Sequence, residues 1–183
     1  AVTSFGNDVW LTGQNGNVYK TLKTTSPIST YNVGSSATLN SITFLNSNTG
    51  FVCGDGGVVY KSVNGGVNWT SSNSGISSVK LNSISFQDNN NGTIAANSGT
   101  IYVTADGGAS WTAQSSGTGY NLLKVKYFAS NIAAVGEYGT ILMNTGSGWT
   151  SVNTRTKSDV RGVSGTGIND VHVCGGGGFI RNN

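Results

Sequence analysis

The chain has 183 residues, of which 36% are hydrophobic and only 9% are charged, and its formal net charge is +3. Nucleic-acid-binding surfaces concentrate Lys and Arg on one face, so this sparse and scattered charge argues against a nucleic-acid partner. No apolar run approaches the ~18 residues needed to cross a bilayer, so the sequence predicts no membrane span. Asn, Ser, Thr and Gly are abundant where charged residues are scarce. This polar but nearly uncharged composition favours an extracellular or virion surface over the cytoplasm.

Five segments along the chain share an apolar run, a turn that ends in Gly, and a second apolar run. The turn glycines follow one another at intervals of 41, 42, 40 and 39 residues: Gly16, Gly57, Gly99, Gly139 and Gly178. A period near 40 built only of strand patterns is typical of a β-propeller. We therefore expect one all-β propeller domain of five four-stranded blades, at about residues 1–38, 39–80, 81–121, 122–159 and 160–183.

The second unit shows the expected strands most clearly. Alternating residues predict a first strand at 41–45, and apolar runs predict strands at 51–54 and 58–63. The fourth strand begins near Asn68, after a turn. No segment has a sustained helical period, so we expect essentially no helix.

The fifth unit ends before its fourth strand. It has apolar runs at 160–164, 171–174 and 179–181, after which the sequence stops at Asn183. We therefore expect the last blade to lack its outer strand here. Because an unpaired strand edge invites pairing, another segment or another chain is a candidate to complete it.

An octapeptide recurs between the third and fourth strands of the units. It reads SVNGGVNW from Ser62 to Trp69 and TADGGASW from Thr104 to Trp111. Both copies closely resemble the Asp-box, or BNR repeat, Ser/Thr-x-Asp-x-Gly-x-x-Trp. The complete unit is most similar to the photosystem II assembly and stability factor-like propellers. That resemblance implies an Asp-box propeller and, as one possible function, an assembly factor or chaperone for a membrane protein complex.

The box varies from unit to unit. Asn64 replaces the Asp in the second unit, the fourth unit is shortened to NTGSGW ending at Trp149, and the first keeps only Thr21 and the apolar Ile28. A metal loop would lose its charged ligands through these changes, whereas a turn needs only a short polar side chain, Gly and an apolar plug. We therefore predict structural turns and neither metal nor cofactor. The predicted turn residues are Ser62, Asn64, Gly66, Trp69, Thr104, Asp106, Gly108, Trp111 and Trp149.

Enzymatic signatures are weak. The arginines are confined to the last two units, as Arg155, Arg161 and Arg181, whereas Asp-box sialidases draw theirs from separate blades. Asp55 and Glu137 occupy equivalent turns and are the best carboxylate pair for a glycan-processing hydrolase, but variable polar turn residues explain them more simply. We expect no enzyme.

The two cysteines fall at equivalent strand positions in units that are not neighbours. A disulfide needs Cα atoms within about 7 Å, so Cys53 and Cys174 are expected to be two buried free thiols.

These observations favour a non-catalytic binding or structural module on an extracellular or virion surface, such as a fibre, decoration or adhesion component that recognises a protein or a glycan. The alternatives are the assembly factor, which predicts a contiguous basic patch, and the hydrolase. The loops that join one unit to the next are the longest and most varied, and binding residues concentrate on loops of rigid scaffolds. The ligand-binding candidates there are Tyr31, Tyr120, Arg155 and Lys157.

Overall fold

The computed structural model describes residues 1–24, 27–167, 170–176 and 180–182, and their strands form five antiparallel sheets. In each sheet the described strands lie side by side in chain order. The strands of the first are β1 (Val2–Phe5), β2 (Asp8–Thr12), β3 (Asn17–Leu22) and β4 (Ser29–Asn32). Those of the second are β5 (Leu39–Phe44), β6 (Gly50–Gly54), β7 (Val59–Ser62) and β8 (Thr70–Ser71).

The remaining sheets repeat this order. The third has β9 (Leu81–Phe86), β10 (Gly92–Ala96), β11 (Thr100–Thr104) and β12 (Thr112–Ser115). The fourth has β13 (Leu122–Phe128), β14 (Asn131–Gly136), β15 (Ile141–Asn144) and β16 (Trp149–Ser151). The fifth has three described strands, β17 (Val160–Gly167), β18 (Asp170–Gly175) and β19 (Ile180–Asn182). The predicted all-β propeller, with a last blade that lacks its outer strand, is confirmed.

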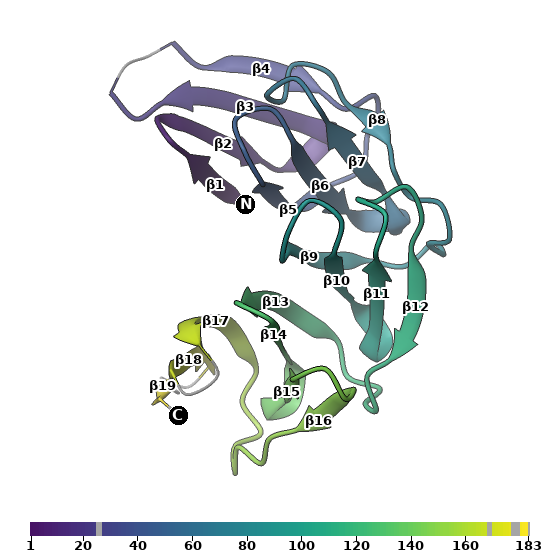
Figure 1. The fold of residues 1–183 in the computed structure, drawn as a ribbon, viewed down its shortest axis with the longest axis vertical. Coiled ribbons are helices and arrows are strands. Elements are labelled where there is room, and N and C mark those ends of the chain that lie inside the picture. Colours follow the sequence, from purple (N-terminus) through teal and green to yellow (C-terminus); the bar gives the residue numbers. More distant parts are fainter. Residues whose placement is uncertain (25–26, 168–169, 177–179, 183) are drawn as a thin grey trace.

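The five blades follow one another along an arc (Figure 1). The first strand of each blade contacts the first strand of the next, from β1 through β5, β9 and β13 to β17. Within the described part of the chain, β1 and β17 do not pack on each other as these neighbours do. The first strands therefore line the inside of the arc, and β4, β8, β12 and β16 lie at the outer edges of their sheets.

The core lies between blades because the two faces of each inner sheet pack on different neighbours. Val52 of blade 2 packs with Trp10 and Val18 of blade 1, whereas its strand neighbours Phe51 and Cys53 pack with blade 3. Adjacent residues of a strand point to opposite faces, so an apolar run such as that of β6 is needed to fill both interfaces. Clusters between blades 3 and 4 and between blades 4 and 5 repeat this arrangement.

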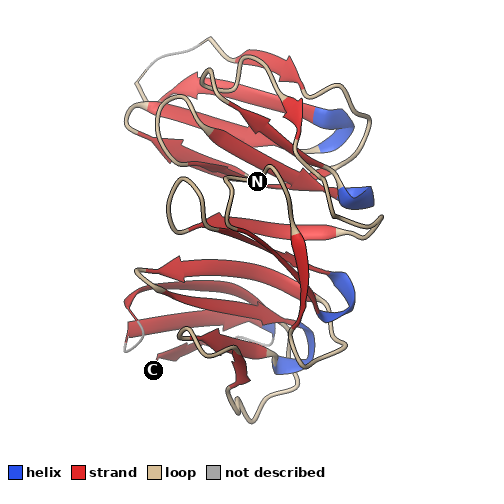
Figure 2. Cartoon of the chain, turned by 45° about the vertical axis from the view of Figure 1, so that its right-hand side comes forward, coloured by secondary structure: helices blue, strands red, loops and turns tan. Residues whose placement is uncertain are grey.

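Helix occurs, among the described residues, only as 3-10 turns that follow the second strand of a blade. Four of these turns are described in full: η1 (Gln14–Gly16), η2 (Asp55–Gly57), η3 (Asn97–Gly99) and η4 (Glu137–Gly139). In blade 5, Gly176 also has a 3-10 conformation directly after β18. Figure 2 shows these turns at the ends of the strands. The turn glycines Gly16, Gly57, Gly99 and Gly139 all have positive φ. A Cβ at any of them would collide with a backbone carbonyl of the connection that leads to the next blade. Gly178, the fifth predicted turn glycine, lies outside the described residues.

A bulge at the start of the inner strands joins blades 2, 3 and 4. The pairing with the second strand shifts register around Asn40 in blade 2 and Asn82 in blade 3. Asn40 Nδ2 donates to the Leu81 carbonyl at 2.8 Å, and Asn82 Nδ2 donates to the Leu122 carbonyl at 2.8 Å. Each bulged side chain therefore satisfies a backbone acceptor on the next inner strand.

The two cysteines are free, but only one is buried. Burial between blades 2 and 3 raises the pKa of the Cys53 thiol. Cys174 is exposed, so the prediction that both thiols are buried is wrong. It lies in β18, where no further described blade covers the sheet face that Cys53 presents to blade 3.

Candidate functional site

The Asp-box turns have the same internal hydrogen bonds in blades 2 and 3. In blade 3 the Gly108 amide donates to Thr104 Oγ1 at 3.0 Å, and the Ser110 amide donates to Asp106 Oδ1 at 2.9 Å. In blade 2 the Gly66 amide donates to Ser62 Oγ at 2.9 Å, and the Asn68 amide donates to Asn64 Oδ1 at 2.9 Å. An amide oxygen thus takes the place of the carboxylate oxygen, which supports the predicted structural role of these turns.

The boxes of blades 2 and 3 also attach each of these blades to the preceding one. Trp10 Nε1 donates to the Gly65 carbonyl at 3.1 Å, and Trp111 Nε1 donates to the Ser72 carbonyl at 2.8 Å. Lys61 Nζ donates to the Gly107 carbonyl at 2.8 Å. The shortened turn of blade 4 lacks an equivalent, and Trp149 Nε1 has no hydrogen-bond partner among the described residues.

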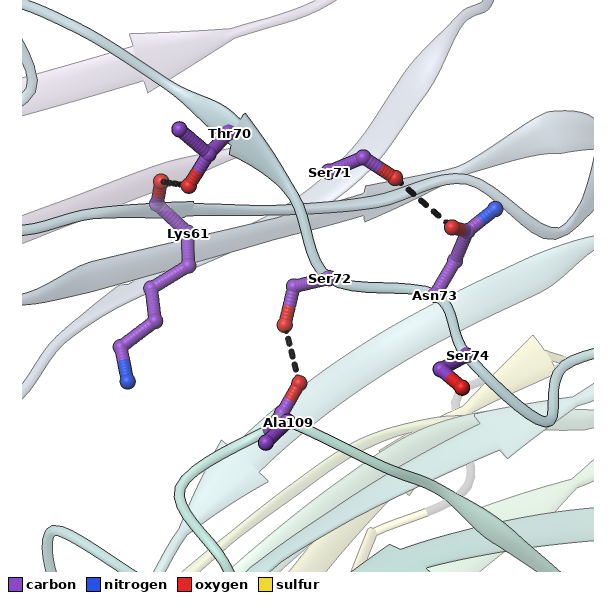
Figure 3. A pocket seen from close by; sticks show the side chains of 8 residues that line it. Lys61, Thr70, Ser71, Ser72, Asn73, Ser74 and Ala109 are labelled. Carbon is purple, nitrogen blue, oxygen red and sulfur yellow. Dashed lines mark hydrogen bonds between the residues drawn. The ribbon is translucent and has the colours of Figure 1, made fainter.

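A polar cleft of about 440 Å³ lies where the box of blade 3 meets the outer strand of blade 2 (Figure 3). Lys61 and Thr70 line it on blade 2, and Ala109 lines it on blade 3. The Ser72 hydroxyl donates to the Gly108 carbonyl across the boundary between the two blades. Lys61 and Ser72 both hydrogen-bond across this boundary, so we assign this cleft to the blade interface and not to the candidate site.

The carboxylates considered for hydrolysis are both hydrogen-bonded to asparagine side chains. Asp55 Oδ1 accepts from Asn40 Nδ2 at 2.7 Å and lies 3.6 Å from Lys80 Nζ. Glu137 Oε1 accepts from Asn121 Nδ2 at 2.9 Å. Asp55 and Glu137 come from blades 2 and 4, with blade 3 between them. Their contacts fit turn residues that anchor neighbouring strands.

Among the described residues, no group of three or more His, Cys, Asp or Glu side chains could hold a metal ion. No described helix is long and apolar enough to cross a membrane.

A pair of exposed tyrosines marks the strongest candidate site. Tyr120 lies in the connection from blade 3 to blade 4, and its ring stacks on that of Tyr138 in η4, with centroids 4.7 Å apart. The two residues are 47% and 60% exposed. Tyr138 has a φ of 51°, which is unfavourable for a bulky residue, whereas Asn15, Gly56 and Ser98 occupy the equivalent turn positions in blades 1, 2 and 3.

A basic connection lies beside this tyrosine pair. Thr154 Oγ1 donates to the Gly139 carbonyl at 3.0 Å, and the Tyr138 amide donates to Asp159 Oδ1 at 3.4 Å. Arg155 and Lys157 lie on the same connection, are exposed, and form no salt bridge within the described part of the chain. Arg161 instead pairs with Asp159 at 2.9 Å.

A cleft of about 330 Å³ opens next to Tyr120. Its wall includes the apolar side chains of Ile141, Leu142, Trp149 and Val152, with hydroxyl groups such as that of Thr118 beside them. This combination of an apolar wall, polar groups and an aromatic edge is typical of small recognition sites. The cleft, the tyrosine pair and the basic connection are hereafter the tyrosine site.

Three of the four predicted ligand-binding residues, Tyr120, Arg155 and Lys157, belong to the tyrosine site. Tyr31 does not, because it lies in the outer strand β4 of blade 1, where it pairs with Val18. We expected Tyr31 in the connection after that strand. Tyr138 was not among the predicted residues, although a tyrosine stood in a turn position that other units fill with Asn, Gly or Ser.

Residues 20–113, just over half of the chain, match the family model of photosynthesis system II assembly factor YCF48. The chain belongs to the YCF48 family. This finding confirms the predicted likeness to photosystem II assembly factor propellers. It also overturns the expected extracellular or virion surface, because the matching model is that of an assembly factor for photosystem II.

Solved structures agree on the fold. YCF48 bound to D1 peptide has a TM-score of 0.74 and 15% identity, over 98% of this chain and 62% of that one. YCF48 from Cyanidioschyzon merolae has a TM-score of 0.74 and 14% identity, over 98% and 67%. A catalytically inactive virginiamycin B lyase from Staphylococcus aureus has a TM-score of 0.79 and 15% identity, over 99% and 68%.

These structural similarities show the propeller fold alone, and the chain spans about 62% of the YCF48 that carries the D1 peptide. No curated protein matches the sequence. The fold and the family together support a binding module. The composition led to the wrong prediction of an extracellular or virion surface because uncharged Asn, Ser and Thr are the residues that the box turns and bulges use.

Proposed function

We propose that this propeller is a non-catalytic assembly factor that binds a segment of a partner protein at the tyrosine site. Family membership supports the class of function, since the family consists of photosystem II assembly factors. A solved YCF48 carries a D1 peptide, so a propeller of this family can hold a peptide. The assembly factor was the alternative interpretation of the sequence, and it now replaces the surface module as the main one.

The exposed tyrosine pair is the observation that carries the proposal. Tyr120 and Tyr138 are largely exposed although they are aromatic, and Tyr138 keeps a backbone conformation that smaller residues adopt more easily. Backbone strain of this kind persists where the surroundings hold it and is frequent at ligand sites. Tyrosine is also enriched among the residues that dominate protein-binding energy.

The basic connection suggests the chemistry of the bound segment. Arg155 and Lys157 offer two positive charges on the connection that packs against the turn of Tyr138, and Arg recognises carboxylates through two parallel hydrogen bonds. We expect a segment with an apolar or aromatic side chain against the tyrosines and a carboxylate within reach of Arg155. Binding should weaken as salt rises because exposed charges are screened.

The rigid blades on either side position this site. Blade 4 packs on blade 3 through Ile101, Leu122 and Val125, and Asn82 joins their inner strands. The loops that carry Tyr120 and Tyr138 therefore start from fixed points, which lowers the ordering cost of binding.

The test is a titration of fluorescently labelled D1 peptide with the purified chain, followed by anisotropy. We expect saturable binding that Tyr120→Ala, Tyr138→Ala and Arg155→Ala each weaken about tenfold, corresponding to roughly 1.4 kcal/mol. Tyr31→Ala is the matched control because it removes a tyrosine from blade 1, and we expect it to leave the affinity unchanged.

Absence of saturable binding would refute peptide recognition by this chain. Binding that all three site variants leave intact would keep the function but reject the tyrosine site. A loss of affinity with Tyr31→Ala alone would move the site to blade 1.

A further inference from the structure

The two rings of the tyrosine site are held together by the residues next to them. Tyr120 is followed by Asn121, and Tyr138 is preceded by Glu137. The Glu137 amide donates to the Asn121 carbonyl at 3.0 Å, and Asn121 Nδ2 donates to Glu137 Oε1 at 2.9 Å. The Asn121 amide also donates to Glu137 Oε2 at 3.4 Å. These hydrogen bonds fix the two backbones side by side and so hold the two tyrosines within reach of each other.

A further contact fixes the backbone of Tyr138 itself. Its amide donates to Asp159 Oδ1 at 3.4 Å, and in blade 3 the Ser98 amide donates to Asn121 Oδ1 at 2.9 Å. In both blades, a side chain just before the next inner strand therefore accepts from the left-handed residue of the turn. Blade 4 differs because that residue carries a phenol ring, and this ring stacks on Tyr120.

The stacking of two phenols sets this pair apart from the other ring contacts of the described residues. The four other contacts join Trp with Phe or Phe with Phe. Tyr102 is buried, and its hydroxyl lies 2.7 Å from Ser77 Oγ. Tyr120 and Tyr138 are both exposed, in loops between blades 3 and 4. A small oxidant in solution can therefore reach both side chains of the pair.

We propose that Tyr120 and Tyr138 form an oxidative crosslinking site, at which the two rings couple to dityrosine. The oxidant is hydrogen peroxide used by a haem peroxidase. Each phenol loses one electron and one proton and becomes a phenoxyl radical. The radicals form a carbon–carbon bond between the ring positions next to their oxygens, and each bonded carbon then passes its hydrogen through solvent to its own oxygen as a proton. One peroxide takes up the two electrons and two protons and becomes two molecules of water.

The geometry favours coupling within one chain. The ring centroids are 4.7 Å apart, which is close to the separation of the centroids in two rings joined directly by a bond. The rings have to turn from a stack to an edge-to-edge arrangement, and exposed side chains change rotamer within nanoseconds. Groups that are held within reach react far faster than groups that must first meet by diffusion. We therefore expect the bond to form inside the monomer.

The crosslink also changes the tyrosine site, and this consequence rests on the proposed function. A bonded pair is fixed edge to edge, whereas an apolar or aromatic side chain of a bound segment packs on the faces of the rings. The bond also joins the turn of blade 4 to the connection that precedes the blade, so the site loses freedom to adapt. We therefore expect oxidation to lower the affinity of the site for a peptide.

The test is treatment of the purified chain, at low micromolar concentration, with a haem peroxidase and hydrogen peroxide. Size-exclusion chromatography isolates the monomer, and dityrosine fluorescence measures the product. Trypsin cleaves after Lys124 and Lys126 and so separates the two tyrosines, which lets mass spectrometry detect the bond as two joined peptides that have lost two hydrogens. We expect a bond between Tyr120 and Tyr138 to be the main crosslink of the monomer.

Tyr120→Phe and Tyr138→Phe are the matched variants, because each keeps a ring in the stack and removes only the phenol hydroxyl. We expect either variant to lower the dityrosine of the monomer about tenfold. Tyr31→Phe removes a phenol from the outer strand of blade 1 and should give as much product as the wild type. A wild-type monomer without dityrosine, dityrosine only between chains, or a product that both site variants leave intact would each overturn the proposal.

Anisotropy with labelled D1 peptide separates this proposal from the proposed function. The crosslinked monomer should bind the peptide about tenfold more weakly than the untreated chain, whereas the same treatment should leave the affinity of Tyr120→Phe unchanged. Equal affinity before and after crosslinking would overturn the effect on the site. An untreated chain that binds no peptide would refute the proposed function, while a crosslink identified by mass would still support the oxidative site.

Discussion

The ring of Tyr138 stacks on that of Tyr120 at a centroid distance of 4.7 Å and an interplanar angle of 29°, while the Tyr138 backbone holds a φ of 51°. Each tyrosine comes from a different kind of loop. Tyr138 belongs to the turn η4 inside blade 4, and Tyr120 belongs to the connection that precedes that blade. The pair therefore depends on the packing of turns against connections that recurs in other blades.

The first prediction separates binding from stability at Tyr138. Tyr138→Asn removes the ring but suits the turn, since Asn15 adopts the same conformation in blade 1. Relief of the backbone strain should offset the lost stack, so we expect the free energy of unfolding to change by less than about 1 kcal/mol. The affinity for D1 peptide should fall about tenfold. Urea denaturation and anisotropy measure the two effects, and a large loss of stability with unchanged affinity would make the pair structural.

The second prediction compares two box tryptophans. Trp111→Phe removes the hydrogen bond from Nε1 to the Ser72 carbonyl, whereas Trp149→Phe removes a buried Nε1 without a partner in the described residues. Both changes delete similar volume, so their difference reports the hydrogen bond. We expect Trp111→Phe to cost roughly 1–3 kcal/mol more in unfolding free energy than Trp149→Phe. Equal costs in urea denaturation would show that the bond across blades 2 and 3 contributes nothing.

The third prediction concerns the acid sensitivity of the blade 3 box. Hydrogen bonds from the Ser110 hydroxyl, the Ser110 amide and the Thr104 hydroxyl lower the pKa of Asp106 to about 2. A lowered carboxyl pKa stabilises the fold above the ordinary value near 3.8, and that contribution is lost as the pH falls toward 2. In Asp106→Asn the side chain no longer titrates. Its amide oxygen can still accept a backbone hydrogen bond, as Asn64 Oδ1 does in blade 2.

We therefore expect Asp106→Asn to be less stable than the wild type near neutral pH, with the gap narrowing between pH of about 4 and about 2. Asp106→Ala should be the less stable of the two variants at neutral pH because it loses every acceptor at that position. Urea denaturation across this pH range measures both. A gap that stays constant with pH would mean that the Asp106 carboxylate does not stabilise the fold.

The fourth prediction tests how closely turn and connection pack near the tyrosine site. Gly99 and Gly117 have φ values of 67° and 80°, but a Cβ at Gly99 would collide with the Thr118 carbonyl, while a Cβ at Gly117 would meet open space. Gly117→Ala should lower the free energy of unfolding by only ~1 kcal/mol, the cost of a left-handed backbone conformation for a residue with a Cβ. Gly99→Ala should cost roughly 2–4 kcal/mol. Similar losses of stability for the two variants in thermal denaturation would show that the connection moves easily to make room for the added Cβ.

Much of the architecture could be predicted because the same sequence pattern recurs in successive blades. The spacing of Gly16, Gly57, Gly99 and Gly139 marks four turns that the structure places in equivalent positions. The box of blade 3 has Asp106 where that of blade 2 has Asn64, which predicted a turn that needs an oxygen acceptor and no charge. Both side chains accept an equivalent backbone amide hydrogen bond.

The candidate site was only partly predictable because it depends on contacts between blades. Tyr120, Arg155 and Lys157 were identified from loop length and chemistry, but the stack with Tyr138 requires the packing of a turn on a connection. Cys174 was expected to be buried by analogy with Cys53. Equivalent positions in a repeat share their burial only where the same neighbour covers them, and the last described blade has no such neighbour on that face.

The most direct test of peptide recognition at the tyrosine site is an NMR titration that follows the tyrosine ring resonances as unlabelled D1 peptide is added. The largest shifts should belong to Tyr120 and Tyr138, whereas Tyr31 and Tyr60 in blades 1 and 2 should stay unperturbed. Saturable binding with unchanged Tyr120 and Tyr138 resonances would contradict the proposed site.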